Sequence, residues 1–378
     1  MYKRLTGGTI LIAALFISLF SCSKSSSEPN PGNETPGGFD KTAMLTNYAD
    51  NVIIPAYQQL QEDINALVNA VNTFADAPSG DAQSAALIAF SQAYVRYQYA
   101  EVYNFGPAGT GQLDYYLNFS GGFDYSFTQN GVLAGYSVDS TTIENNIASG
   151  NYDLSLYDRN NFYSQGFPAL NYLLFGPNAI EKFGTNTANR AKYLKDVALR
   201  MKTLVDVVVT GWSAYRSNFI ANTKSDVGSP IGNLVNMLAY EMDLMKGPRI
   251  GWPFGKQSNG IVFASKSEGY FAGIGSQLAR ANIRSLKNAY LGGSGSKGIS
   301  AYLVSLKKET LNSDVLAQFD IVIEKLDAVP DPLSESFISN ATQVEDAYKE
   351  IQKLLTLLKT DVSSALGVQI SFMDNDGD

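Results

Sequence analysis

Two residue types limit the chemistry that this chain can perform. The sequence contains no histidine, and Cys22 is its only cysteine. A catalytic zinc site takes about three protein ligands, usually with imidazole among them. The sequence therefore predicts no zinc site and leaves carboxylates as metal ligands. An axial haem ligand would have to be tyrosine or methionine, and a single cysteine leaves no disulfide within the fold.

One segment has the spacing of a short helix that could carry a site. It runs from Gly166 to Gly176 and reads GFPALNYLLFG. Residues three apart on a helix share a face, so positions 168 and 171 would face the same point. Pro168 has no ligand atom in its side chain, and Asn171 offers a neutral amide oxygen, a weak transition-metal ligand and a poor general base. The segment predicts a helix starting near Pro168 without the usual acid–base or metal-binding groups.

The elements that would position this segment are helices. Apolar residues recur three and four apart over Lys41–Phe74, with Pro55 as a kink or boundary, and again over Ala188–Ile220. Ala108–Ser164 has a weaker pattern and predicts short helices or turns. Lys246-Gly247-Pro248 is expected to close a preceding helix. The remaining expected helices are Asp81–Tyr103, with Asp81 as N-cap, Pro230–Met245, Glu268–Tyr290, Ile299–Glu309, Ser313–Leu326 and Ala341–Leu366. This pattern predicts an all-α fold of packed helical bundles.

The N-terminus has the pattern of a bacterial lipoprotein signal. A basic pair precedes the apolar run Thr9–Phe20, which is too short to span a bilayer comfortably, and Leu19-Phe20-Ser21-Cys22 resembles a lipobox. We predict a signal peptide over 1–21, lipidation at Cys22 and a flexible tether over 22–40, rich in Ser, Pro and Gly. The protein is then expected on a bacterial membrane, facing the periplasm or at the cell surface. An ordinary secretory signal with an incidental cysteine is the alternative.

The charge balance argues against one class of partner. The chain has 28 basic and 36 acidic residues, for a formal net charge of -8. An acidic protein does not favour nucleic acid, whose phosphates attract basic surfaces. We therefore expect no nucleic-acid partner.

The motifs, taken in order, resemble those of the imelysin-like proteins, also called the M75 peptidase family. Members usually carry Gly-x-His-x-x-Glu followed by Tyr-Leu-Leu-Phe-Gly; this chain keeps Gly166 but has Pro168 at the His position and Asn171 at the Glu position. The resemblance covers nearly all of Lys41 to Asp378. The further segments that carry it are Asn51–Tyr57, Ala93–Tyr97, Glu101–Pro107, Arg249–Pro253, Ser265–Glu268, Leu286–Gly292 and Leu366–Phe372.

The resemblance implies two helical bundles related by duplication, with the signature segment near their interface. We place the first bundle at 41–185, including that segment, and the second at 186–378. It also implies a periplasmic or surface protein associated with iron or haem acquisition. Some relatives are described as peptidases, an activity that the residues at positions 168 and 171 do not support.

Six positions in or beside the matching segments are candidates for binding a ligand. They are Glu101, Asn171, Tyr172, Glu241, Arg249 and Glu268. Gathered at the interface, they could hold a hard cation or a small polar ligand. The alternative is a buried network of hydrogen bonds and ion pairs that joins the bundles, because buried polar groups need partners with or without a ligand.

The sequence favours a membrane-anchored, non-enzymatic imelysin-like lipoprotein that binds an iron-related ligand or a partner protein. One alternative is a divergent hydrolase that uses carboxylates and a metal. Another is a surface scaffold with no small ligand.

Overall fold

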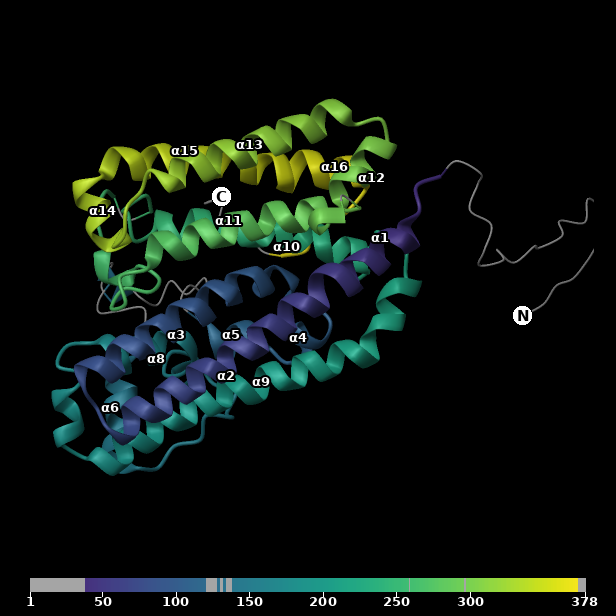
Figure 1. The fold of residues 1–378 in the computed structure, drawn as a ribbon. Coiled ribbons are helices and arrows are strands. Elements are labelled where there is room, and N and C mark those ends of the chain that lie inside the picture. The colour runs from purple at the N-terminus through teal and green to yellow at the C-terminus, as the bar shows by residue number, and fades with distance from the viewer. Residues whose placement is uncertain are drawn as a thin grey trace, which may run out of the picture. The chain divides into compact units, whose positions relative to one another are not determined.

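The described chain folds almost entirely into helices, which lie in two groups (Figure 1). The computed structural model describes residues 38–119, 128–129, 132–133, 138–257, 259–295 and 297–372. The predicted signal peptide and Cys22 lie outside these ranges. From Phe39 onward the chain forms one compact unit. The all-α fold predicted from the sequence is confirmed, whereas an origin by duplication stays a prediction.

The first group of α-helices comprises α1 (Lys41–Asn47), α2 (Ile54–Asp76), α3 (Gly80–Ala100), α4 (Pro107–Thr110), α5 (Leu113–Leu117), α6 (Ser140–Ser149), α7 (Arg159–Phe162), α8 (Gly166–Phe175) and α9 (Thr187–Ala221). The second comprises α10 (Pro230–Leu244), α11 (Gly275–Leu291), α12 (Ile299–Ser305), α13 (Glu309–Asp327), α14 (Leu333–Ser339), α15 (Ala341–Thr356) and α16 (Ser363–Leu366). Two short strands, β1 (Thr128–Gln129) and β2 (Val132–Leu133), pair antiparallel with Thr128 opposite Leu133. Within the described ranges, no helix is long and apolar enough to cross a membrane.

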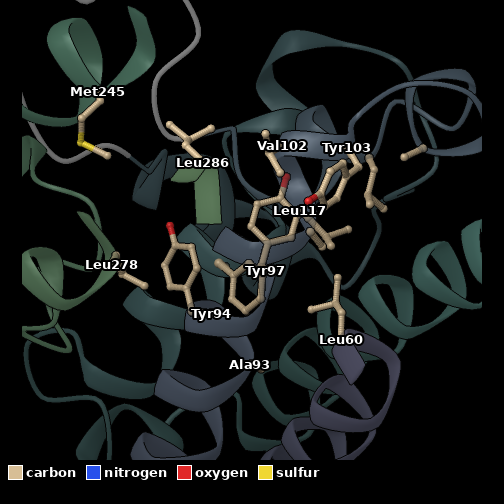
Figure 2. Packing of buried hydrophobic residues seen from close by; sticks show 14 of the residues in the cluster. Leu60, Ala93, Tyr94, Tyr97, Val102, Tyr103, Leu117, Met245, Leu278 and Leu286 are labelled. Atoms are coloured by element: carbon tan, nitrogen blue, oxygen red, sulfur yellow. The ribbon is translucent and has the colours of Figure 1, made fainter. Parts of the chain in front are cut away.

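Helix α3 joins the two groups. It packs against α2 on one side and α11 on the other. Figure 2 shows Tyr94 and Tyr97 of α3 among Leu60 of α2 and Leu278 and Leu286 of α11. All five side chains are at most 1% exposed. One apolar core therefore runs through both groups, and its aromatic rings keep polar groups at the junction away from water.

Helix α9 lies with the first group. Its most extensive packing is along α2, and it also contacts α4, α6 and α8 (Figure 1). The apolar residues that recur three and four apart on this helix include Tyr193, Val208 and Trp212, all at most 1% exposed. Helix α9 packs with the first group and α10 contacts α11 and α15 of the second, so the change of group falls after α9. The sequence analysis puts the start of the second bundle at residue 186, before this helix. The proposed division at 185/186 itself stays a prediction.

Two prolines lie where the helix widens into π-helical turns. Tyr48–Ile53 is π-helical and precedes Pro55, the second residue of α2, which does not interrupt the helical path. Met245–Gly251 is π-helical and contains Pro248, so Lys246-Gly247-Pro248 does not close the helix as predicted. A π turn bonds an N–H to the carbonyl five residues back, as Trp252 N–H does to Gly247 at 2.9 Å, while Pro248 has no N–H to donate.

Other helix starts also differ from prediction, as at α13, which begins at Glu309 and not at Ser313. Ser79, not Asp81, caps α3, because its hydroxyl accepts the Ala82 N–H at 3.2 Å. Helix α11 starts at Gly275, so Glu268 lies in the preceding loop and not at a helix start. The loop turns at Gly269 and Gly273, both with positive φ, a conformation that glycine adopts without strain.

Candidate functional site

A single guanidinium lies among three buried carboxylates where the two groups of helices meet. Arg249 Nη2 lies 2.6 Å from Glu101 Oε1, Nη1 lies 3.2 Å from Glu241 Oε2, and Nε lies 3.8 Å from Glu268 Oε2. The four side chains are only 3–6% exposed. We call these four residues the arginine centre. Glu101 comes from the first group of helices, whereas Glu241, Arg249 and Glu268 come from residues 241–268, so the centre joins two segments that are distant in the sequence.

Different elements supply each member of the centre. Glu101 follows α3 in a 3₁₀ turn, Glu101–Tyr103. Glu241 lies in α10, and Arg249 lies in the π-helical turn Met245–Gly251 that extends it. Extra residues in a π turn change the direction in which side chains point and are frequent at functional sites. Here, the turn keeps the chain helical past Pro248 and brings Arg249 beside Glu241.

Neutral polar side chains complete the surroundings of the carboxylates. Glu268 Oε1 accepts hydrogen bonds from the Tyr94 hydroxyl at 3.0 Å, Gln98 Nε2 at 3.1 Å and Asn118 Nδ2 at 2.8 Å. Asn282 Nδ2 of α11 donates to both Glu101 at 2.9 Å and Glu241 at 3.1 Å. The Asn282 Oδ1 atom is buried without a hydrogen-bond partner within the described structure. This oxygen is an acceptor whose lone pairs are not used.

The electrostatics of the centre are those of an acidic interior with one fixed cation. Burial raises the pKa of Glu101 well above its usual value, and the neighbouring Glu241 and Glu268 add to this rise against the opposing effect of Arg249. Burial likewise raises the pKa of Glu241. Burial alone would lower the pKa of Arg249, but the three carboxylates hold it well above its ordinary value. Arg249 therefore stays charged, while Glu101 and Glu241 hold protons to a higher pH than exposed carboxyls.

The signature segment lies at the same junction but supplies backbone contacts and not ligands. Asn171 of α8 is buried, and its Oδ1 accepts the N–H of Ala272, at 2.9 Å, in the loop that carries Glu268. Pro168 is buried in the first turn of α8, where its missing N–H is not needed. Gly166 has φ +70°, and a Cβ there would lie 2.3 Å from the Leu117 carbonyl oxygen. The glycine of the motif is thus required by the backbone.

Tyr172 belongs to a second charged group. Its hydroxyl donates to Glu144 Oε1 at 2.7 Å and lies 2.9 Å from Lys182 Nζ. Arg190 also forms an ion pair with Glu144. We call Glu144, Tyr172, Lys182 and Arg190 the Glu144 cluster. Its carboxylate is 35% exposed, in contrast to the buried arginine centre.

The structure therefore brings four of the six predicted positions into direct contact. Glu101, Glu241, Arg249 and Glu268 form the centre; Asn171 supports the loop beside it, and Tyr172 contacts Glu144. Sequence reasoning missed four polar neighbours: Tyr94, Gln98, Asn118 and Asn282. Gln98 lies one helical turn from Tyr94 and three residues before Glu101, a same-face spacing that could have pointed to it.

The centre has the right donor atoms for a hard cation, but Arg249 lies among them. Within the described residues, no group of three or more acidic or cysteine side chains is placed to hold a metal ion. An open groove of about 590 Å³ lies at the α3–α11 junction, lined by Leu87, Ile88, Ser91, Gln92, Val95, Arg96, Tyr99 and Gln277. None of the six predicted positions lines it.

Fold and site together define an all-helical protein whose two groups of helices meet at a buried, arginine-centred acidic cluster. The family model for imelysin matches residues 53–363, and the chain belongs to the imelysin family. Among curated proteins, none is significantly similar in sequence.

Solved structures have the same fold. A protein named as an iron-regulated protein A precursor, from Parabacteroides distasonis, is similar with a TM-score of 0.69 and 21% identity; the match covers 86% of this chain and 95% of that one. An imelysin-like protein from Psychrobacter arcticum is similar with a TM-score of 0.68 and 19% identity, over 89% of this chain and 99% of that one.

Proposed function

We propose that this chain is a lipid-anchored imelysin-like protein with an iron-related role, acting by binding a partner or an iron-related ligand and not by hydrolysis. The observation that carries the non-enzymatic part is the arginine centre. Its three carboxylates, which would be the ligands of a carboxylate-based metal enzyme, face the guanidinium of Arg249 at 2.6, 3.2 and 3.8 Å. Carboxylates that face a fixed positive charge are poorly placed to ligate a catalytic metal, which needs an open coordination position.

The two positions of the family motif support the same proposal. Pro168 contributes no ligand atom, and the Asn171 oxygen accepts a backbone N–H. A hydrolase needs a base or a metal-bound water near its substrate. Neither residue supplies one, so the motif in this chain positions backbone.

The iron-related part rests on membership of the imelysin family and on the name of one structural relative, the iron-regulated protein A precursor. The anchoring part rests on the lipobox-like Leu19-Phe20-Ser21-Cys22. Two or three acyl chains on Cys22 would hold the protein at a bacterial membrane, on the periplasmic side or at the cell surface.

One set of measurements on the full chain separates the proposed role from hydrolysis. Protein extracted from membranes in detergent is assayed for cleavage of an unfolded protein substrate with and without added Zn²⁺, Mn²⁺ or Fe²⁺. We expect no cleavage above that of a control chain that carries both Arg249→Lys and Glu268→Gln. Metal-dependent cleavage that this control loses would establish the hydrolase alternative.

Two further measurements test the binding role and the anchor. The abundance of the protein should rise when the host is starved of iron, and titration with Fe³⁺ or haem, or cross-linking in cells, should identify a ligand or partner. Unchanged abundance together with no ligand and no partner would leave only a scaffold. The Cys22→Ser variant should leave the membrane fraction; its full retention would contradict lipidation.

A further inference from the structure

The arginine centre has the donor set of a cation site whose central position is taken by a side chain. We propose that the Arg249 guanidinium stands where a metal ion would sit in a latent oxygen-ligand site, and that removing it opens this site to a divalent cation such as Ca²⁺ or Mn²⁺. The proposal goes beyond the iron-related role and does not depend on it.

The surrounding atoms are those that hard cations prefer. Ca²⁺ takes six to eight oxygen ligands from carboxylates, amide carbonyls and water. Glu101, Glu241 and Glu268 converge on Arg249 from three segments and carry up to six such oxygens. In the native geometry they surround a guanidinium, which is wider than a metal ion, so the flexible glutamate side chains must close in once it is gone.

An independent observation is the unused oxygen of Asn282. This side chain is fully buried, and Oδ1 has no hydrogen-bond partner within the described structure. Its Nδ2 lies between Glu101 and Glu241, at 2.9 and 3.1 Å. In the native fold the oxygen faces away from these carboxylates. Once Arg249 is gone, a half-turn of the amide about its last torsion, which gives up both hydrogen bonds of Nδ2, would turn the oxygen toward them, where it could bind a cation. The site then has an amide ligand that the native protein leaves unsatisfied.

The charge balance favours a cation of higher charge. The native centre has one positive charge facing three carboxyl groups, and buried charges need partners. A divalent ion would compensate more of this negative charge than Arg249 does. The guanidinium also explains why the native centre should reject metal, since a second cation would lie against a fixed positive charge.

The test adds Ca²⁺ or Mn²⁺ alone to the chelator-treated full chain and measures bound metal and thermal unfolding. The Arg249→Ala variant should bind one equivalent, at least about tenfold more tightly than wild type, and its unfolding temperature should rise with cation. Wild type and Arg249→Lys should show neither effect. The matched control Arg216→Ala, which breaks an exposed pair with Asp50, should behave as wild type.

A second change identifies the ligands. Adding Glu241→Gln to Arg249→Ala should weaken the acquired binding, because it removes one charged ligand. If Arg249→Ala does not fold without metal, Ca²⁺ or Mn²⁺ should restore a cooperative unfolding transition. A folded Arg249→Ala chain that binds no more cation than wild type overturns the proposal, as does failure of both Arg249→Ala and Arg249→Met to fold in the presence of either cation.

Discussion

The arginine centre and the Glu144 cluster are two charged groups with opposite compositions. The first has one guanidinium among three carboxylates and is at most 6% exposed. The second has one carboxylate, Glu144, facing Lys182 and Arg190, and that carboxylate is 35% exposed. Both join segments far apart in the sequence. Buried carboxylates that lose their only cation are left without a charged partner or water. A half-exposed carboxylate that loses its cations is still solvated by water, so the loss of stability is smaller.

Helix α8 connects the two regions. Asn171 contacts the loop that carries Glu268, and the next residue, Tyr172, contacts Glu144. Neighbouring residues on a helix point about 100° apart, so this helix supports a buried group with one residue and a half-exposed group with the next. The difference in burial predicts that equivalent substitutions have unequal effects in the two regions.

The largest effect is expected from removing the buried cation. Arg249→Met, in chelator, should lower the free energy of unfolding by about 3–5 kcal/mol, because the buried carboxylates lose their charged partner. Denaturant unfolding followed by circular dichroism measures the change. Arg216→Met is the matched control, since the exposed Arg216 pairs with Asp50 at 2.5 and 2.6 Å. Equal losses in the two variants would remove the contrast between buried and exposed pairs.

A smaller loss is expected where α8 begins. Gly166→Ala should cost at least about 2 kcal/mol, because φ is +70° and the new Cβ would meet the Leu117 carbonyl at 2.3 Å. Gly184→Ala is the control, since a Cβ there would meet no atom within 4 Å. The same denaturant titration applies. If the Gly166→Ala chain were as stable as the Gly184→Ala chain, the close approach of Gly166 to the Leu117 carbonyl would not fix the start of α8.

The sequence was sufficient to predict the helical fold and the approximate place of the centre. Apolar periodicity predicts the long helices, and Glu101, Glu241, Arg249 and Glu268 are four of the six candidates that the sequence analysis names in or beside the matching segments. It could not show that Pro248 continues a helix, because a π turn is set by the packing around it and not by local propensity. The prediction of a helix end there was therefore wrong.

The polar contacts were harder to predict than the helices. Asn171 and Tyr172 are adjacent and came from one motif, yet their side chains reach different groups. Asn282 was missed because a lone Asn in an amphipathic helix gives no sign of burial. Its position between Glu101 and Glu241 depends on how α11 packs against α3 and α10. Such three-body contacts follow from tertiary packing, which spacing along one segment does not encode.

The dependence of stability on pH should have opposite signs in the two regions. Burial raises the folded-state pKa of Glu101 above its unfolded value. Its contribution to stability is therefore complete below the unfolded pKa and is lost as pH rises through the folded pKa, by about 1.4 kcal/mol per pH unit between the two values. Relative to wild type, Glu101→Gln should gain stability as pH rises across this window. Unfolding titrations at several pH values measure the difference; a constant difference would mean that Glu101 keeps an ordinary pKa in the fold.

The smallest effect is expected at Glu144, where the sign is reversed. Burial raises the pKa of Glu144, but Tyr172, Arg190 and Lys182 together hold it below its usual value. The resulting stability is present above the unfolded pKa and is lost as pH falls through the folded pKa. Because the carboxylate is 35% exposed and screened by water, Glu144→Gln should cost only about 0.2–1 kcal/mol at neutral pH, and less in high salt.

Denaturant titrations in low and high salt, at neutral and acidic pH, test this effect against Glu181→Gln, which alters an exposed carboxylate of the nearby turn Glu181–Gly184. Glu181→Gln should change little under any of these conditions. A Glu144→Gln loss that approaches that of Arg249→Met and persists in high salt would show that Arg190, itself only 6% exposed, makes this cluster behave as a buried one. Exposure would then not explain the contrast between the regions, because the half-exposed Glu144 would depend on its cations as much as a buried carboxylate does. The remaining difference would be the number of cations, two in the Glu144 cluster and one in the arginine centre.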